Sequence, residues 1–468
     1  MEQALLFDIG STFTKARLVD LEQGILLASS EAETTVQEDV SLGVQRTLEE
    51  LGDWEQAGIR LGCSSAAGGL RLIAIGLVPS LTAEAARRAA LGAGARVLTT
   101  FSYRLSPEEV QEIEALAPDI ILLAGGTDGG NREHLLANSR LLAESDWSCP
   151  LVLAGNIKAR GQAQALLEEG EFQVFPTENV MPELEVLNIE PCRKLIRQVF
   201  LERITRARGL ENLPAIDNVL MPTPAAVMEA ADLLQRGPGG ADQGWGDIMV
   251  ADIGGATTDI HSLAEGTPRQ NGVTPRGLPE PRAKRTVEGD LGLRYNARNI
   301  VETWSKDCFL ELLEKIFPAG DWEQELENYL SRLEKNPGSV PLTGSEQKID
   351  AVLGRAALAL SGDRHCGKME RVFTPQGPVL FQYGKDLTGV PCIIGCGGVL
   401  ARGPTPEVVI DGIAAGTGDE GVLRPENPAY YLDRDYIMFA AGLLAQRYPE
   451  AAFRLMENSL IKLERGTD

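Results

Sequence analysis

Two stretches of the chain carry one pattern, in which a short apolar run ends in aspartate, isoleucine and glycine. The later stretch, Asp252–Ile260, follows the apolar residues 248–251, and the earlier one, Asp8–Lys15, follows residues 5–7. The matching positions are Asp8 with Asp252, Ile9 with Ile253, Gly10 with Gly254 and Thr14 with Thr258. Glycines let a backbone turn sharply and approach another group closely. Two such turns in one register, heading two halves of a long chain, predict a duplicated fold.

The residues of these turns suit a phosphorylated ligand. Exposed amide N–H groups and threonine hydroxyls in a glycine-rich turn bind phosphate oxygens, and an acid at the end of a strand suits a hydrated Mg²⁺. We therefore expect a duplicated nucleotide clamp, in which both loops converge on one magnesium triphosphate between two hinged halves.

Composition limits the class of protein. A chain of 468 residues is too long for one core, and its 50 glycines favour an α/β architecture with many tight turns. The net charge of −23 argues against a nucleic-acid or anionic-membrane partner. No run approaches the ~18 apolar residues of a membrane helix, and the start does not resemble a signal peptide. Seven scattered cysteines favour reduced thiols and a cytoplasmic location.

Periodicity divides the chain into three regions. Residues 4–36 predict three antiparallel strands, with the first loop as the hairpin between the first two. Residues 82–212 alternate helices with short apolar runs, which predicts a parallel, doubly wound sheet. From 247 the first pattern returns, followed by helices near 291–316, 322–334 and 345–361 and by two short strands within 363–385. Helices at 224–234 and 434–446 carry small-residue faces.

One turn of the middle region is a candidate second ligand site. Gly125, Gly126, Thr127 and Asp128 follow an apolar strand, and ligands of parallel sheets bind beyond the carboxyl ends of strands. A tight turn before the helix 132–145 is the alternative, and it stays open. The spacing does not match the dinucleotide fingerprint.

Five features follow one another in a fixed order along the chain. They are Asp8–Lys15, the helix at 222–231, Asp252–Ile260, Gly395–Ala401 and the helix at 435–444. This order resembles the actin, hexokinase and heat-shock-chaperone ATPase superfamily. The resemblance implies an α/β fold with two duplicated ribonuclease-H-like lobes and an inserted parallel α/β domain. The first lobe would hold 1–81, 213–246 and 435–468, the insertion 82–212, and the second lobe 247–434.

Four local motifs resemble a narrower family, the glutamate mutase accessory proteins called MutL or GlmL. The motifs are DIGSTFTK from Asp8, LAGGTDGG from Leu123, RTVEGDLG from Arg285 and GCGGVLA from Gly395. The resemblance implies a cytoplasmic ATPase that uses ATP and Mg²⁺ and reactivates a cobalamin-dependent mutase or aminomutase. The partners would be mutase subunits, with no nucleic acid and no membrane, and a homodimer is left open. The corrin-binding Asp-x-His-x-x-Gly pattern is absent.

The resemblance also implies residue roles. Asp8 and Asp252 would be catalytic and would hold Mg²⁺ mostly through water. The phosphates would contact Gly10, Ser11, Thr12, Thr14, Lys15, Gly254, Gly255, Thr257 and Thr258. Adenosine would contact Gly397 and Gly398, and ribose or Mg²⁺ would contact Glu288 and Asp290. A solvated lysine at 15 and helix-capping acids at 288 and 290 are the plain alternatives. Thr223 is a candidate for orienting the attacking water.

Three other functions compete with the accessory ATPase. A small-molecule kinase uses the same scaffold, and an actin-like scaffold protein is a second alternative. A third is an activator with an iron–sulfur cluster, for which Cys392 and Cys396 would be ligands, although no Cys-x-x-Cys pair exists. Asp363–Cys366 predicts an ordinary polar surface turn.

Overall fold

The chain opens with an antiparallel sheet that continues into two parallel strands. The computed structural model describes residues 2–10, 13–34, 40–65, 70–207, 216–240, 243–318, 320–375, 377–415 and 421–464. The strand order is β10-β4-β1-β2-β3, in which β1, β2 and β3 are antiparallel and β4 and β10 run parallel to β1. The strands are β1 (Gln3–Ile9), β2 (Phe13–Asp20), β3 (Ile25–Glu33), β4 (Ile59–Ser64) and β10 (Asn218–Pro222). Helix α1 (Val40–Leu51) packs on β2 and β3.

A second sheet repeats this order later in the chain. Its order is β14-β12-β11-β17-β18-β19, with β11, β12 and β14 antiparallel and β17 and β18 parallel to β11. The strands are β11 (Ile248–Ile253), β12 (Thr258–Leu263), β14 (Ala283–Glu288), β17 (Cys392–Cys396), β18 (Ala429–Leu432) and β19 (Ile461–Leu463). Among the described strands of this sheet, β19 is the one without a counterpart in the first sheet. The predicted duplication of ribonuclease-H-like lobes is confirmed.

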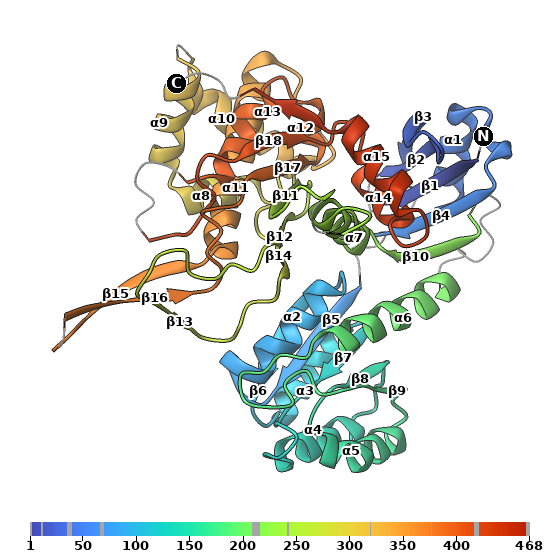
Figure 1. The fold of residues 1–468 in the computed structure, drawn as a ribbon, viewed down its shortest axis with the longest axis vertical. Coiled ribbons are helices and arrows are strands. Elements are labelled where there is room, and N and C mark those ends of the chain that lie inside the picture. Colours follow the sequence, from blue (N-terminus) through green and yellow to red (C-terminus); the bar gives the residue numbers. More distant parts are fainter. Residues whose placement is uncertain are drawn as a thin grey trace. The chain divides into compact units, whose positions relative to one another are not determined.

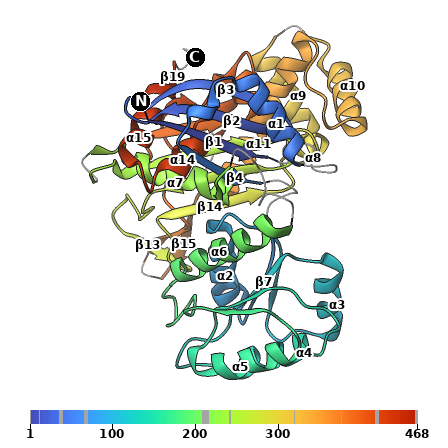
Figure 2. The same ribbon diagram turned by 90° about the vertical axis from the view of Figure 1, so that its right-hand side faces the viewer.

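A five-stranded parallel sheet of order β6-β5-β7-β8-β9 lies between them in the sequence. Its strands are β5 (Arg71–Gly76), β6 (Arg96–Ser102), β7 (Ile120–Leu123), β8 (Leu151–Leu153) and β9 (Val174–Pro176). Helices α2 (Glu84–Gly92) and α6 (Glu190–Ala207) cover one face, and α3 (Pro107–Leu116), α4 (Glu133–Ala143) and α5 (Ile157–Glu169) cover the other (Figures 1 and 2).

The predicted doubly wound region therefore exists, but its sheet begins earlier than expected. β5 starts at Arg71, before the expected boundary at residue 82, and it pairs with both β6 and β7. Alternate residues of β5 serve opposite cores, since Leu72 packs with α2 and α6 whereas Ile73 packs with α3, α4 and α5.

Helices fill the core of the second lobe. They are α8 (Ala297–Trp304), α9 (Lys306–Ile316), α10 (Trp322–Lys335), α11 (Gly344–His365), α12 (Gly398–Arg402) and α13 (Pro406–Ile410). The single helix expected at 291–316 is wrong, because a turn precedes α8 and Ser305, with φ of 76°, separates α8 from α9. The surface turn expected at Asp363–Cys366 is also wrong. Helix α11 continues to His365, and His365 and Cys366 are buried.

The chain divides into two compact units. The first holds Met1–Ala230, Gly277–Pro279 and Phe439–Ala452, and the second holds Ala231–Arg276, Glu280–Met438 and Phe453–Asp468. The division falls within α7 (Thr223–Arg236) and α14 (Met438–Leu444), and also within α15 (Pro449–Ser459). Among the described residues, no helix combines the length and the apolar character that crossing a membrane requires.

A small sheet of order β13-β16-β15 projects from the rest of the second unit (Figure 1). We call it the arm; it consists of β13 (Val273–Arg276), β15 (Lys368–Thr374) and β16 (Gly377–Tyr383). The two short strands expected within 363–385 are confirmed. The pairing of β13 with β16 was not expected, because residues 266–282 were interpreted as a polar excursion.

Candidate functional site

The two Asp-Ile-Gly turns are hairpins of the same construction. Asp8 lies opposite Lys15 across β1 and β2, and Asp252 lies opposite Asp259 across β11 and β12. The N–H of Gly10 donates to the carbonyl of Phe13 at 3.1 Å, and that of Gly254 donates to the carbonyl of Thr257 at 2.9 Å. Register and turn closure therefore repeat together.

Close backbone approach explains the first glycine of each hairpin. A Cβ at Gly10 would lie 2.6 Å from the carbonyl oxygen of Phe13, and a Cβ at Gly254 would lie 3.0 Å from that of Thr257. At position 10 such a contact requires a shift of the backbone, whereas at position 254 the neighbour would have to move by only a few tenths of an ångström. Both turns thus favour glycine for the same reason, and position 10 more strictly.

A cysteine lies beside each loop aspartate on the neighbouring parallel strand. Cys63 of β4 lies in register with Asp8, and Cys396 of β17 lies in register with Asp252. Burial, followed by the neighbouring Asp8 carboxylate, raises the pKa of the Cys63 thiol well above its ordinary value. The thiol therefore stays neutral beside the carboxylate. Sequence inspection missed this second repeat because the two cysteines share no local motif.

The carboxylate of Asp8 is buried and held on several sides. The residue is 5% exposed, and its side chain contacts Lys15, Thr223 and Cys63. Lys15 Nζ lies 3.3 Å from Oδ2, the Thr223 hydroxyl donates to Oδ1 at 2.6 Å, and the Cys63 thiol lies 3.7 Å from Oδ1. Lys15 is therefore not a freely solvated strand lysine. Thr223, the first residue of α7, fixes the orientation of the carboxylate.

The threonines at the start of β2 and β12 are fully buried. The Thr14 hydroxyl lies 2.9 Å from that of Thr34, and the Thr258 hydroxyl donates to the carbonyl of Leu291 at 2.7 Å. Both hydroxyls are thus engaged in bonds that hold the hairpins. Ser11 and Thr12 lie outside the described residues.

The segment that precedes α8 occupies the carbonyl groups of the second hairpin. The amides of Leu293 and Arg294 donate to Gly254 and Gly255 at 3.1 and 2.9 Å, and the Asn296 side chain donates to Ala256. In the described part of the chain, no hydrogen bond uses the N–H groups of Gly255, Ala256 and Thr257. Successive amides in such a turn can bind an anion.

Position 259 has a different environment from its counterpart, Lys15. Asp259 accepts hydrogen bonds from Arg285 Nε at 2.9 Å and Nη2 at 2.5 Å, and from the Thr257 hydroxyl at 3.0 Å. The side chains of Arg285 and Asp259 are only 5% and 12% exposed. The Thr257 hydroxyl, a predicted phosphate ligand, is therefore turned toward its own strand.

Glu288 and Asp290 share one cation that the sequence did not reveal. Arg364, near the end of α11, contacts Glu288 at 2.8 Å and both oxygens of Asp290 at 2.6 and 2.9 Å. This contact lowers the pKa of Asp290. Both predicted ribose or Mg²⁺ contacts thus form an ion-pair cluster with Arg364 in this structure.

The turn after β17 approaches the end of β11 very closely. Gly397 has a φ of 103°, and a Cβ there would lie 2.2 Å from the carbonyl oxygen of Ile253. A Cβ at Gly398, the first residue of α12, would meet nothing closer than the Tyr436 hydroxyl at 3.8 Å. Gly397 therefore seats this turn against the strand of the second loop, whereas Gly398 leaves open space.

The predicted second site, Gly125, Gly126, Thr127 and Asp128, is a turn fastened from within. Asn156 is fully buried and donates to the carbonyl of Thr127, and Asn179 is 3% exposed and donates to Gly126 and to Asp128 at 2.9 Å. Asp128 also accepts from the amide of Ile157 at the start of α5. These contacts favour the tight-turn alternative, since the carbonyl groups of Gly126 and Thr127 and the carboxylate of Asp128 already have partners.

The inserted sheet is tied to α7 inside the first unit. A Cβ at Gly94 would lie 2.9 Å from the Pro222 side chain, so the turn after α2 packs tightly against the residue that precedes α7. Arg197 of α6 bonds to Glu229 of α7 at 2.7 Å. Near α14, a Cβ at Gly442 would lie 1.9 Å from the carbonyl oxygen of Ala226, so α14 and α7 are in backbone contact.

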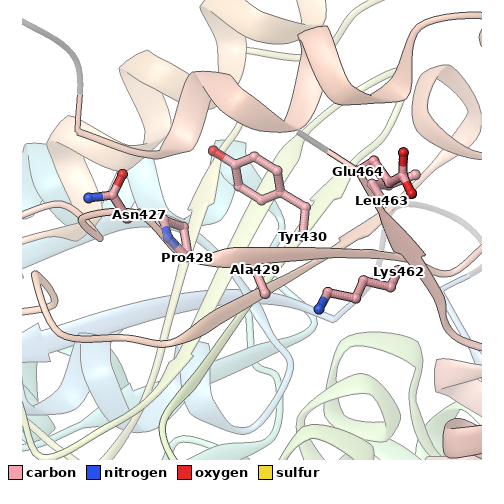
Figure 3. A pocket seen from close by; sticks show the side chains of 7 residues that line it. All are labelled: Asn427, Pro428, Ala429, Tyr430, Lys462, Leu463 and Glu464. Atoms are coloured by element: carbon pink, nitrogen blue, oxygen red, sulfur yellow. The ribbon is translucent and has the colours of Figure 1, made fainter. Parts of the chain in front are cut away.

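One depression in the second unit measures about 670 Å³ and is open to solvent. Its lining comes from the β18 and β19 segments, Asn427–Tyr430 and Lys462–Glu464 (Figure 3). The Tyr430 hydroxyl donates to Asp411. None of the predicted site residues lines the depression, and it assembles no recognisable chemistry. Within the described residues, no three His, Cys, Asp or Glu side chains group as ligands for a metal ion.

Comparisons with known proteins show which family the chain belongs to. Two solved structures share the arrangement weakly, and at these scores they support no conclusion about activity. They are a xylulose kinase from Lactobacillus acidophilus (10% identity, 99% of this chain and 93% of that one, TM-score 0.37) and the ADPNP-bound activator of 2-hydroxyisocaproyl-CoA dehydratase from Clostridium difficile (11%, 100% of both chains, 0.28). "Protein MutL" from Clostridium tetanomorphum is 44% identical over 469 residues, 99% of this chain and 100% of the relative. Because the family model "MutL protein" also matches residues 4–460, the chain belongs to the MutL protein family.

Proposed function

We propose that the chain is a Mg-ATP-dependent ATPase that acts as an accessory or reactivating factor for a cobalamin-dependent mutase or aminomutase. The observation that carries the nucleotide part is the repeated hairpin, with an aspartate at the end of each first strand. The three adjoining N–H groups of Gly255–Thr257 support this part, because they can donate hydrogen bonds to phosphate oxygens. Family membership supports the mutase part.

The residues fit a hydrated magnesium ion that is held by few protein ligands. Mg²⁺ keeps several waters and typically takes one or two carboxylates together with substrate phosphates. Asp8 and Asp252 would hold it, and the ion would neutralise charge on the phosphates. Phosphoryl transfer asks the protein mainly for positioning and for neutralisation of charge. Lys15 would add positive charge, and Thr223 would keep the Asp8 carboxylate in position.

The buried threonines take a different role in this proposal from the one their sequence implied. Thr14 and Thr258 would hold the two hairpins through their buried hydroxyl groups, and the backbone amides would contact the phosphates. Gly397 and Gly398 would form the floor of the adenosine site, with Gly398 leaving the room. Arg364 would keep Glu288 and Asp290 together at the ribose side.

Phosphate release by the full chain with ATP and Mg²⁺ tests the ATPase part. Asp8→Ala and Asp252→Ala should each lower the turnover about 100-fold or more, since both remove a charge that the reaction needs. Asp53→Ala is the control, because this exposed carboxylate lies in a turn far along the chain from both loops. Calorimetric titration should give one nucleotide per chain. A wild type that does not hydrolyse ATP, or two aspartate variants that retain the wild-type rate, would refute the proposal.

The mutase part needs a separate assay. A purified cobalamin-dependent glutamate mutase is inactivated by turnover and then incubated with the chain, ATP and Mg²⁺. Recovery of activity that Asp8→Ala fails to give supports the accessory role. No recovery with an active ATPase removes this part and leaves the ATPase. Hydrolysis that depends on an added metabolite would instead favour a kinase.

A further inference from the structure

The arm exposes apolar side chains on both faces of its small sheet. Phe373, near the turn between β15 and β16, is 80% exposed, and Tyr383 is 43% exposed. Phe381, on the same face as Tyr383, and Leu380, on the opposite face, are only half buried. A three-stranded sheet with no covered face buries little apolar surface of its own, and such exposed patches mark interaction sites.

The root of the arm is firmly held, which makes the exposed part a prepared surface. Gln382 is 2% exposed, and its side chain donates to the carbonyls of Gly266 and Gly384 at 2.8 Å. Lys385, which follows β16, is fully buried and donates to the carbonyl of Arg282 at 2.7 Å. A surface that is ordered before binding loses less conformational entropy when a partner arrives.

The outer edge of β15 is paired only at its beginning. Lys368 forms a bridge with Val422, and the amide of Met369 donates to the carbonyl of Gly421. Beyond these residues, β15 borders only β16 in the described part of the chain. An edge with open backbone groups pairs readily with another chain, and charged side chains such as Glu370 and Arg371 limit which chain that is.

The charge of the arm differs from that of the chain. Its strands carry three basic side chains, Arg276, Lys368 and Arg371, and one acidic side chain, Glu370. The whole chain has a net charge of −23, so the part outside the arm is more negative still. A second copy of the chain thus offers an acidic surface, whereas a second arm would bring like charges together.

We propose that the arm is a self-association element that docks on the acidic body of a second copy of this chain. In a two-fold dimer each arm makes this contact once, so the buried area is doubled. Phe373 provides the apolar anchor, and Arg371, two residues before it on β15, lies on the same face. Arg276, whose guanidinium stacks on Phe381 at 4.4 Å, adds positive charge on the other face. This inference does not depend on the proposed ATPase activity.

Sedimentation velocity of the full chain, over a range of concentrations, tests the proposal. The wild type should form a dimer with a micromolar dissociation constant, as expected for an interface of modest size. Phe373→Ser should raise this constant at least about 10-fold. Arg276→Glu combined with Arg371→Glu should do the same. Leu342→Ser is the matched control, since Leu342 is 74% exposed elsewhere in the second unit, and it should leave the constant unchanged.

The salt dependence of the dimer distinguishes the proposed arm-to-body contact from arm-to-arm pairing. Raising the salt concentration should weaken contact between a basic arm and an acidic body, because it screens attraction. A dimer that strengthens with salt would indicate arm-to-arm pairing and overturn the proposal. A wild type that stays monomeric at 100 times the expected constant, or an arm that binds RNA while the chain remains monomeric, would also overturn it. Thermal unfolding of each variant checks that the fold is intact.

Discussion

The two hairpins share a backbone but differ in what holds the residue opposite the aspartate. In the first lobe this residue is Lys15, which contacts Asp8 at 3.3 Å and has a side chain that is 18% exposed. In the second lobe it is Asp259, which binds Arg285 tightly and is nearly buried. Duplication therefore preserved the turn and its register, while the charge beside the turn diverged.

This difference suggests separate roles for the two residues, one at the proposed ligand site and one in holding the fold. The first hairpin keeps the cation of Lys15 beside Asp8, and this aspartate is oriented by Thr223. The second hairpin uses its charges within its own lobe, and among the described residues the N–H groups of Gly255, Ala256 and Thr257 donate no hydrogen bond. We expect substitutions at position 15 to affect nucleotide binding and substitutions at position 259 to affect folding.

Asp259→Ala should destabilise the fold far more than any change at position 15. It leaves Arg285 buried without its main partner, and breaking a buried pair on one side costs about 3–5 kcal/mol. Lys15→Met should cost about 1 kcal/mol, because its contact is longer and partly exposed. Urea unfolding measures the free energy, and ATP titration should show weaker binding for Lys15→Met. Equal losses of stability in the two variants would break the comparison.

Gly10→Ala and Gly254→Ala test whether the hairpins are equally tight. The new methyl group would lie 2.6 Å from a carbonyl oxygen at position 10 but 3.0 Å at position 254. Crowding of this kind costs about 1–3 kcal/mol. We therefore expect the free energy of unfolding to fall by about 2 kcal/mol for Gly10→Ala and by about 1 kcal/mol for Gly254→Ala. Thermal unfolding gives the order, and a larger loss at position 254 would contradict it. Gly129→Ala, where a Cβ would meet nothing, is the control.

Thr223→Val should separate rate from affinity. The variant removes the 2.6 Å hydrogen bond to Asp8, which as a bond to a charged group contributes about 1.5 kcal/mol. We expect kcat for ATP hydrolysis to fall about 10-fold with little change in KM, and Thr223→Ser to restore most of it. Asp433, which follows β18 as Thr223 follows β10, instead accepts hydrogen bonds from the amides of Ile437 and Met438 at the start of α14. Asp433→Asn should therefore act on stability, and a pure loss of kcat there would contradict this assignment.

The pH dependence of stability should belong to the second lobe. Burial lowers the pKa of Lys385 to about 7, whereas the unfolded chain keeps the ordinary value near 10.5. Between these values the unfolded state binds more protons, so stability rises with pH by at most about 1.4 kcal/mol per unit. Neighbouring groups that contact or face this amine are Ser262, Lys284, Glu280, Asp247, Glu265 and His365.

The first lobe buries an arginine rather than a lysine. Arg17 is 1% exposed and bonds to the carbonyl of Ser30 and to Glu31. Calorimetric unfolding at pH 7 and 9 measures the difference, and Lys385→Met should flatten it. A slope that survives this substitution would assign the effect to another group.

Local patterns predicted the parts of the fold that local residues determine. The repeated Asp-Ile-Gly turns gave the hairpins and their duplication, because glycine and a strand-ending aspartate act where they stand. Partners that lie far along the chain could not be read in this way. Cys63 beside Asp8 and Arg364 beside Asp290 depend on strand pairing and on the length of α11.

Polar residues misled the interpretation where their partners are buried. His365 belongs to a polar run, but its ring bonds to Ser262 and Thr286 inside the second lobe. Burial lowers the pKa of His365 well below its ordinary value, so its ring is neutral. Polarity alone does not distinguish a solvated turn from a satisfied interior helix end. β5 was missed although its residues are mostly apolar, because a short apolar run does not show which sheet it joins.

The backbone contact between Gly442 and Ala226 has a consequence for how the chain tolerates change. The helices touch without side chains between them, so any residue larger than glycine at 442 would act as a wedge and force α14 away from α7. The chain leaves the first unit just after Ala230 and, apart from Gly277–Pro279, enters it again at Phe439. The two helices that continue from one unit into the other are thus in backbone contact a few residues from the unit boundary. A single methyl group at Gly442 would therefore disturb both helices at once, although it would lie in neither hairpin.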